Sequence, residues 1–362
     1  MGQAAGSHRG VRASGSRATT PRVTYLRVSV TDRCNERCIY CMPPEGVRLK
    51  THGDVLSYEE MTRVVRCAVP LGVRTVRLTG GEPLVRRGLV EFARDVAAVP
   101  GVEDVALTTN GLLLPAVARA LRKAGVRRVN ISLDTLRPGR YRDITRTGSF
   151  ADAWAGLEAA LEAGFRPVKV NTVVMRGVND DEIEDMALIA AEGVLTWRFI
   201  ELMPLGEAGR LGEDMLVPAA EVVERLAALA AARGLPFTEE GAGSARRGDG
   251  RDGRAGAGPG PFAGAGPARY FRFGRGRVGV ISPMTHGFCA ECNRLRLTSD
   301  GRVHPCLTSP LEVDLAGALR GGASDEEITA LLAEAVRMKP EAHRMRERLP
   351  ELAERRMSRI GG

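Results

Sequence analysis

Three cysteines lie close together near the start of the chain, at Cys34, Cys38 and Cys41, separated by three and then by two residues. Three thiolates at this spacing suit three corners of an iron–sulfur cube, and the fourth iron is left without a nearby protein ligand. Such an iron can bind a substrate or a cofactor. Zinc sites more usually complete a tetrahedron with a second cysteine pair or with histidines, and this run contains no histidine. Buried structural cysteines are the simpler alternative.

A second group of cysteines, Cys289, Cys292 and Cys306, follows in the last quarter of the chain. It again offers three thiolates rather than four, so the pattern predicts a second iron–sulfur cluster with an open iron. Zinc bound with the help of His286 or His304 remains the competing interpretation.

Positive charge is concentrated in arginine. Arg294 and Arg296 are two positions apart, so they share one face of a strand, and paired guanidinium groups suit phosphate. Lysine occurs at only four positions, which makes Lys169 conspicuous. The net charge of +8 and the pI near 9.4 favour a polyanionic ligand, either nucleic acid or a nucleotide triphosphate. Aromatic residues are only 4% of the chain, which argues against stacking platforms for single strands.

The seven cysteines are odd in number and clustered, unlike a secreted disulfide framework. We therefore expect a reducing, cytoplasmic compartment. No apolar run is long enough to cross a bilayer, so no membrane role is predicted.

Short apolar runs alternate with longer amphipathic segments from about residue 22, as in parallel strands joined by crossover helices. We expect strands at 25–30, 75–78, 102–108, 128–133, 168–173 and 197–202, and helices at 57–68, 86–98, 115–124, 151–163, 180–192 and 218–231. The unusual residues fall at or just after the carboxyl ends of the strands, where barrel-like α/β arrays build their sites. The predicted class is α/β, an incomplete (β/α)6 TIM-like barrel with a C-terminal α+β extension that carries the second cluster.

Composition divides the chain into four regions. Residues 1–20 are predicted to be a disordered tail, and residues 21–235 the partial barrel. A tract of Gly, Ala, Arg and Pro predicts a disordered insertion over 236–268. Residues 269–362 form the C-terminal region, in which we expect a hairpin with strands at 270–273 and 277–281.

The C-x3-C-x2-C run after the first strand, with Gly80-Gly81-Glu82-Pro83 after the second, resembles the radical S-adenosylmethionine (SAM) superfamily. That resemblance implies that the methionyl group of SAM chelates the open iron of a [4Fe-4S] cluster. It further implies a SAM pocket lined by residues from four segments, namely Tyr40, Gly81, Ser132 and Met203. Glycine lets the backbone approach a ligand closely. Capping of the next helix is the alternative role for Ser132 and Asp134.

With both cysteine groups present, residues 21–362 resemble the GTP 3′,8-cyclase family of molybdenum cofactor biosynthesis. The resemblance implies two [4Fe-4S] clusters, with the second anchoring guanine through its open iron. It implies that the nucleotide is held by six residues, Arg27, Arg77, Thr108, Lys169, Arg294 and Arg296. Asn171 and Arg198 are expected on the same interior face as Lys169. The Gly361-Gly362 terminus also matches the family, in which the tail is thought to reach the active site.

The implied reaction converts GTP to (8S)-3′,8-cyclo-7,8-dihydroguanosine 5′-triphosphate through a 5′-deoxyadenosyl radical that takes the ribose 3′ hydrogen. The implied partners are a reductant protein of the flavodoxin or ferredoxin type and cyclic pyranopterin monophosphate synthase, which receives the product. A homodimer is compatible with the resemblance, whereas nucleic acid and membrane are not expected as partners. Two alternatives remain, a peptide-modifying radical SAM maturase with an auxiliary cluster and a zinc-binding nucleic-acid protein.

Overall fold

A computed structural model describes residues 23–241, 266–289 and 292–342, together with Met357 and Ile360. The predicted tail at 1–20, most of the predicted insertion and the Gly361-Gly362 terminus lie outside the described residues.

Six parallel strands form the centre of the fold and follow one another in chain order, each hydrogen-bonded to the next. They are β1 (Tyr25–Ser29), β2 (Thr75–Thr79), β3 (Asp104–Thr109), β4 (Val126–Ser132), β5 (Val168–Val174) and β6 (Thr196–Glu201). All six predicted strands are confirmed to within two residues at each end. They are readable from sequence because each is a short run with apolar side chains at alternate positions, and the segments between them are longer and amphipathic.

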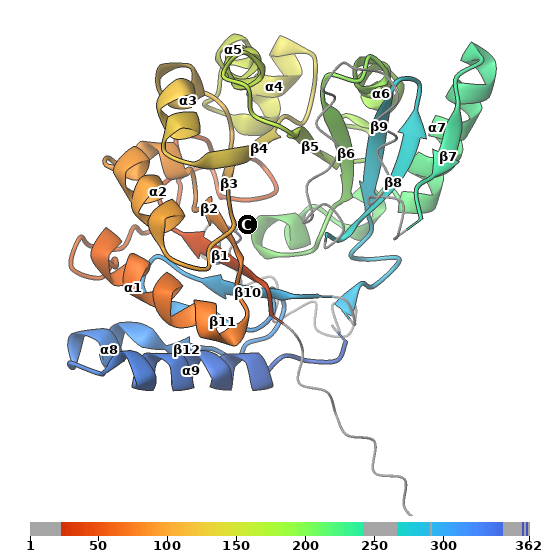
Figure 1. Ribbon diagram of the computed structural model, residues 1–362. Coiled ribbons are helices and arrows are strands. Elements are labelled where there is room, and N and C mark those ends of the chain that lie inside the picture. The colour runs from red at the N-terminus through yellow and green to blue at the C-terminus, as the bar shows by residue number, and fades with distance from the viewer. Residues whose placement is uncertain (1–22, 242–265, 290–291, 343–356, 358–359, 361–362) are drawn as a thin grey trace, which may run out of the picture.

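Helices cover the outer face of this curved sheet (Figure 1). They are α1 (Tyr58–Ala68), α2 (Leu89–Ala98), α3 (Leu114–Lys123), α4 (Pro138–Thr145), α5 (Phe150–Glu162), α6 (Ile183–Ala191) and α7 (Ala219–Arg233). Apolar side chains of the strands and helices pack into one continuous core between the two layers. Polar side chains such as Arg77, Asn130, Lys169 and Arg198 stand on the opposite, inner face of the strands, where they are buried without joining that core.

The C-terminal region extends the sheet at both of its edges. β8 (Ala268–Phe273) and β9 (Gly276–Ile281) form the expected hairpin, and β9 joins β6 in parallel, with β7 (Phe237–Glu239) outside β8. On the other edge, β10 (Arg294–Leu297) joins β1 in parallel and is followed by β11 (Arg302–His304) and β12 (Val313–Asp314). Helices α8 (Leu315–Arg320) and α9 (Asp325–Arg337) pack below, beside α1 and β12 (Figure 1).

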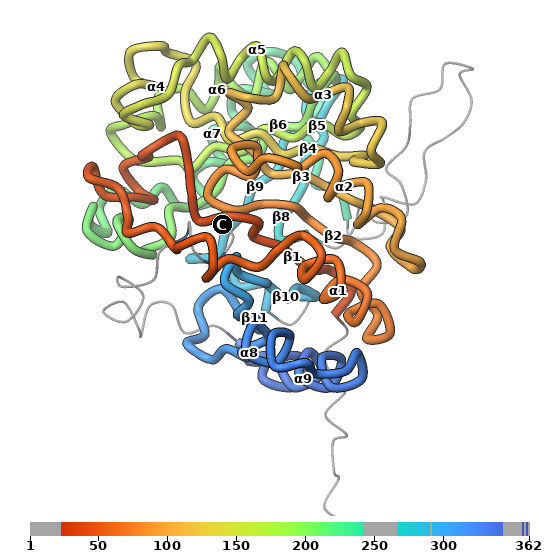
Figure 2. The backbone as a smooth tube through the Cα atoms, turned by 90° about the vertical axis from the view of Figure 1, so that its left-hand side faces the viewer, coloured from red at the N-terminus to blue at the C-terminus, as the bar shows by residue number. Residues whose placement is uncertain are grey.

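The described strands therefore make one 12-stranded sheet in the order β12-β11-β10-β1-β2-β3-β4-β5-β6-β9-β8-β7. The sheet curls without closing, because β12 and β7 are its two edges and do not pair with each other. Figure 2 shows β10 and β11 continuing the sheet beyond β1. The predicted partial barrel is confirmed. The C-terminal segments continue the barrel wall, and so the second cysteine group is brought beside the first strand.

Local signals explain most element boundaries. Ser57 begins α1 with a reciprocal capping box to Glu60, and Gly234 ends α7 in the left-handed conformation. Asp180 is not the helix cap that its type suggested, because a short 3-10 turn over Asp180–Glu182 precedes α6. The helix α4 was not predicted. The predicted insertion begins too early, since Phe237–Glu239 is an edge strand paired with β8.

None of the helices in the described ranges combines the length and the apolar character that crossing a membrane requires.

Candidate active site

One large cavity of about 1130 Å³ fills the centre of the barrel. It is lined by the first cysteine group and by every residue that we expected to contact SAM or GTP: Cys34, Cys38, Cys41, Tyr40, Gly81, Ser132, Met203, Arg27, Arg77, Thr108, Lys169, Arg294 and Arg296. These residues come from seven strands or the loops after them. The structure thus brings the predicted site residues together, while their division between SAM and GTP stays a prediction.

The first cysteine loop is compact and half-buried. Backbone N–H groups of Cys41 and Met42 both donate to the carbonyl of Cys38, at 2.9 and 3.0 Å, which coils the last part of the loop. The segment after α4 supports the loop from outside. Arg146 donates to the carbonyls of Arg37 and Met42, at 2.9 and 2.8 Å. None of the three thiols is in a disulfide, and all three line the same cavity.

The glycine run after β2 has a structural role in addition to the ligand contact that we expected. A Cβ on Gly81 would lie 2.3 Å from the carbonyl oxygen of Arg33, and one on Gly80 would lie 2.7 Å from that of Thr31. The N–H of Gly81 donates to Thr31 and that of Glu82 to Arg33, both at 2.8 Å. The glycines are therefore needed so that the backbone after β2 can pack against the chain entering the cysteine loop. Gly81 also lines the cavity.

Two buried carboxylates organise the rim around this loop. Glu82 accepts from the hydroxyl of Thr109 at 2.7 Å and from the N–H of Asn110 at 2.7 Å. Asp134 accepts from the hydroxyl of Tyr40 at 2.7 Å and from the N–H of Val173 at 2.8 Å. Asp134 does not cap a helix. Burial raises the pKa of Glu82 to about 7 and that of Asp134 to about 6.

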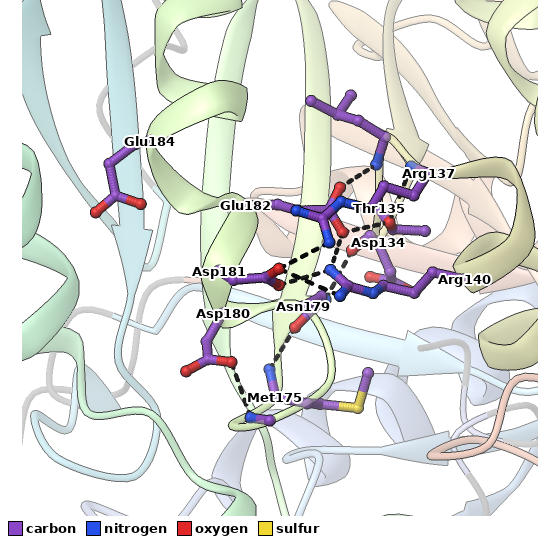
Figure 3. A network of polar contacts seen from close by, with 12 residues as sticks. Asp134, Thr135, Arg137, Arg140, Met175, Asn179, Asp180, Asp181, Glu182 and Glu184 are labelled. Atoms are coloured by element: carbon purple, nitrogen blue, oxygen red, sulfur yellow. Dashed lines mark hydrogen bonds and ion pairs between the residues drawn. The ribbon is translucent and has the colours of Figure 1, made fainter.

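The strand end that carries Asp134 is itself held by a polar network (Figure 3). Asn179 donates to the carbonyls of Asp134 and Val173, at 2.7 and 2.9 Å. Buried Glu182 accepts from the hydroxyl of Thr135 at 2.5 Å and from the N–H of Leu136 at 2.6 Å. The segment before α6 thereby ties the ends of β4 and β5 together. This bracing fixes the direction of the Asp134 carboxylate toward the cavity rim.

A row of arginines crosses three adjacent strands on the inner face. Strand register places Arg296 of β10 beside Arg27 of β1, and Arg27 beside Arg77 of β2. Arg294 lies two residues before Arg296 and opposite Tyr25. Arg77 and Arg296 are buried, and burial lowers the pKa of Arg296 to about 10. Buried cations that lie this close together repel one another. A bound anion offsets this repulsion, so the row attracts an anion strongly.

Arg77 is held from several sides. It donates to the carbonyl of Leu107 at 3.0 Å and to the hydroxyl of Thr108 at 3.2 Å, and it contacts the hydroxyl of Tyr25. The side-chain amide of Asn130 is oriented with its oxygen toward the arginines. This oxygen accepts hydrogen bonds from Arg198 at 2.7 Å and from Arg77 at 3.1 Å. Polar Asn130 within an apolar strand was a signal that we had not used.

Lys169 faces a tyrosine that the sequence interpretation missed. Its ammonium donates to the hydroxyl of Tyr270 on β8 at 2.9 Å, and the guanidinium of Arg277 lies 4.3 Å from the centre of the Tyr270 ring. Tyr270 pairs with Gly279, where a Cβ would come within 3.0 Å of both that ring and Arg198. A glycine inside a strand marks such a close approach, and it was the available signal.

Arg198 meets the sequence expectation, because it donates to Asn171 of the neighbouring strand at 2.8 Å and lines the same cavity. Both residues therefore stand on the Lys169 side of the barrel.

The second cysteine group lies directly behind the cavity wall. Its chain neighbours Phe288, Asn293 and Leu307 line the cavity, whereas Cys289, Cys292 and Cys306 do not. The N–H of Cys292 donates to the carbonyl of Cys289 at 3.0 Å, which makes a tight turn. None of these three cysteines is in a disulfide, and all three are half-buried.

The zinc interpretation of this second group has little geometric support. His304 is buried on β11 with its Nε2 atom 3.5 Å from Glu312, and His286 is exposed. Within the part of the chain that the structure describes, no three His, Cys, Asp or Glu side chains converge as ligands of one metal ion. A [4Fe-4S] cluster takes one thiolate on each of its irons, so its ligands stand apart around a cube. Each cysteine group supplies three thiols outside any disulfide, which is the donor set that such a cluster uses.

The chemistry of the first thiols also fits a cluster rather than free nucleophiles. Burial, with added repulsion from Glu82 and Glu36, raises the pKa of Cys34 to about 12. Burial likewise raises the pKa of Cys38. Such thiols keep their protons near neutral pH unless metal cations replace them. A reactive cysteine would need the opposite surroundings.

Comparison with known proteins agrees with this geometry. Residues 28–190 match the family model described as Radical SAM superfamily, and residues 259–345 match Molybdenum Cofactor Synthesis C. A GTP 3′,8-cyclase of Pelotomaculum thermopropionicum is 49% identical over 342 residues, covering 94% of this chain and 98% of the relative. One of Moorella thermoacetica is 47% identical over 345 residues, with the same coverage of both chains.

Among solved structures, SuiB of Streptococcus suis bound to S-adenosylmethionine aligns with a TM-score of 0.55 and 13% identity, covering 82% of this chain and 68% of that one. At this identity the likeness concerns the fold alone. The sequence relatives, in contrast, match over nearly their whole length. The chain belongs to the GTP 3′,8-cyclase family of the radical SAM superfamily.

Proposed function

We propose that this protein converts GTP to (8S)-3′,8-cyclo-7,8-dihydroguanosine 5′-triphosphate in molybdenum cofactor biosynthesis. The observation that carries the proposal is one large cavity lined both by the first cysteine group and by buried cations. A triphosphate carries several negative charges, and it must be paired where water is scarce. The family membership supports the same substrate.

The first cysteine group, Cys34, Cys38 and Cys41, would hold the cluster that binds SAM. When bound and reduced, that cluster supplies the electron that splits SAM into methionine and a 5′-deoxyadenosyl radical. Tyr40, anchored by Asp134, stands beside the cysteines where it can pack against the adenosine. Three further residues, Gly81, Ser132 and Met203, would complete the SAM pocket on this side of the cavity.

The cationic wall would position the nucleotide. Arg27, Arg77 and Arg296 form one continuous row across three strands, which suits an extended chain of phosphates. Lys169 lies farther round the barrel and would bind the end of the triphosphate or the ribose. Thr108 and Arg294 would complete the contacts with the nucleotide. The ribose 3′ hydrogen then faces the SAM side. Correct placement and exclusion of water are the main contributions of the protein to radical chemistry.

The second cysteine group, Cys289, Cys292 and Cys306, would hold a cluster whose open iron anchors guanine. Its neighbours Phe288, Asn293 and Leu307 line the cavity, and this supports a cluster that would be within reach of the base end of the nucleotide. A peptide-modifying maturase would have no use for the buried row of arginines. This charge pattern favours the nucleotide over the peptide.

We further propose a cytoplasmic location, with a flavodoxin or ferredoxin as the source of electrons and cyclic pyranopterin monophosphate synthase as the recipient of the product. The many thiols that must stay reduced support that compartment. A homodimer is part of the same proposal, and its test is the mass of the anaerobic protein by light scattering.

The experiment is an anaerobic assay. Reconstituted protein should contain about eight irons per chain if both clusters form. With dithionite, SAM and GTP it should release 5′-deoxyadenosine and the cyclised nucleotide together, and much less deoxyadenosine without GTP. ATP is the matched control, since it offers the same phosphates with another base. Abundant deoxyadenosine that does not depend on GTP would overturn the substrate, and a zinc-only preparation would overturn the reaction class.

A further inference from the structure

A lysine near the C-terminus reaches the second cysteine group. Lys339 is one of four lysines in the chain and lies two residues after the end of α9. Its ammonium lies 3.6 Å from the Sγ atom of Cys292 and donates to the carbonyls of Arg294 at 2.8 Å and Pro305 at 3.1 Å. An ammonium has three N–H donors, and all three have acceptors here.

These acceptors belong to two different segments. Arg294 begins β10, two residues after Cys292, while Pro305 immediately precedes Cys306. Lys339 therefore ties the segment of one cysteine to the segment of another. No disulfide joins them in the described part of the chain. A cluster with one thiolate from each segment needs both to keep their separation.

The position of Lys339 is itself rigid. Ile328, Leu332 and Ala335 of α9 are fully buried in the main core, and the helix begins with a capping box at Ser324. The N–H of Lys339 donates to the carbonyl of Val336 at 3.2 Å, which continues the last turn. The packing of α9 therefore fixes the position of the Lys339 ammonium.

We propose that Lys339 is a positioning residue for the second iron–sulfur cluster, in which its ammonium holds the Cys292 and Cys306 segments together and makes the cluster easier to reduce. This inference rests on the proposed function, because it requires the second cluster. It adds to that function a residue that neither ligates iron nor lines the cavity.

The expected effect on reduction follows from charge. One electron taken from an external reductant such as dithionite leaves the cluster one unit more negative, with no bond made or broken. A cation and an N–H donor at a thiolate sulfur stabilise the more negative state and raise the reduction potential. Removing the ammonium therefore makes reduction harder.

The test uses the full chain in a background with Cys34→Ala, Cys38→Ala and Cys41→Ala, so that only the second cluster gives a signal. Lys339→Met removes the charge and the donors at similar length, Lys339→Gln retains a donor without the charge, and Lys339→Arg retains both. The control is Lys123→Met, which removes an exposed lysine of α3. Iron content and the midpoint potential, followed by electron paramagnetic resonance, are measured for each.

We expect the potential of the Met and Gln variants to fall, so that about tenfold less cluster is reduced at a fixed potential, equivalent to about 59 mV for one electron. Lys339→Arg should restore most of this difference, and Lys123→Met should show none. Loss of iron from the Met variant with retention in the Arg variant would support the holding role. Unchanged iron and unchanged potential in the Met and Gln variants would overturn the proposal.

If Lys339→Met does not fold, Lys339→Gln is compared with Lys339→Arg. A merely structural contact would leave the reduction potential of the cluster the same in both variants, because it does not depend on the charge of the side chain. A background protein that holds no iron at all would contradict the second cluster, and with it the proposed function, rather than the role of Lys339.

Discussion

The loop of Cys34, Cys38 and Cys41 lies among buried carboxylates, whereas the turn of Cys292 lies among cations. Burial and the charges of Glu82 and Glu36 raise the pKa of the Cys34 thiol to about 12. Burial would also raise the pKa of Cys292, but Lys339 and Arg294 overcome it and hold that pKa below the ordinary value. Two groups with the same ligand set are thus placed in opposite fields.

This contrast teaches how one ligand set can serve two tasks. Negative surroundings make a cluster harder to reduce and therefore a stronger reductant, which splitting SAM requires. Positive surroundings suit a site that stands beside a polyanionic substrate. The carboxylates of Glu82 and Asp134 also brace the first loop through hydrogen bonds, so charge and structure are provided by the same residues.

The largest expected effect comes from removing one cysteine of each group. Cys38→Ala should abolish 5′-deoxyadenosine formation, because the first cluster supplies the electron. Cys292→Ala should keep about four irons per chain and some SAM cleavage, but it should lose the cyclised nucleotide. Iron analysis and product chromatography check both variants. Equal residual SAM cleavage in the two would break the proposed division of labour.

The cationic wall should matter for the nucleotide and not for SAM. Lys169→Met leaves Tyr270 and the phosphates without their ammonium, and we expect the KM for GTP to rise by about 100-fold. The affinity for SAM should change little. Steady-state kinetics with each substrate varied in turn provides the measurement, and Lys123→Met is the matched control. A comparable loss of SAM affinity would contradict the separation of the two pockets.

The glycine run offers a smaller test, confined to the first loop. In Gly81→Ala the new Cβ would lie 2.3 Å from the Arg33 carbonyl, so the backbone must shift. We expect a loss of about 1–3 kcal/mol in the free energy of unfolding and weaker retention of the first cluster. Anaerobic urea unfolding and iron analysis measure these. Gly139→Ala, which meets no atom within 4 Å, is the control and should be neutral.

The smallest effect is expected from pH. Burial lowers the pKa of Lys169 to about 8, and although burial raises that of Tyr270, the cations Lys169 and Arg198 bring it down to about 7. Both groups therefore lose protons as pH rises from about 7 to 9, and the wall becomes less positive. GTP affinity should fall several-fold across this window. Nucleotide titrations at fixed ionic strength measure the fall.

In Tyr270→Phe only the lysine titrates, and Lys169 loses an acceptor that stabilises its charge. The fall in affinity should then follow one ionisation rather than two. An identical pH profile in the wild type and the variant would rule out the tyrosine as a contributor.

Much of the fold was predictable because its signals are local. The strands at 168–173 and 197–202 were predictable because apolar side chains such as Val168, Val170, Trp197 and Phe199 occupy alternate positions, and Gly234 ends its helix because it adopts positive φ. The short helix α4 and the edge strand β7 were missed, because each has a weak pattern of its own and depends on neighbours.

The candidate site divides in the same way. Both cysteine groups could be identified from sequence, since cysteine is the usual ligand of such clusters and the residues are grouped along the chain. The family resemblance, with the alternation of side chains along a strand, placed Lys169 and Arg198 on the inner face. Tyr270 and Asn130 gave weaker signals, a glycine across the hairpin and a polar residue within an apolar strand. Neither signal indicates which residue Tyr270 or Asn130 contacts.

What the sequence by itself determined is the chemistry: two sets of three thiols, an arginine-rich face and the order of strands that presents them. Only the tertiary structure decided which residues surround each set. Lys339 lies beside Cys292 because α9 packs under the first edge of the sheet, and Gly81 is required because two backbone segments meet there. Contacts between distant segments depend on packing and on the electrostatic field of the assembled barrel. The spacing of residues along the sequence predicts neither.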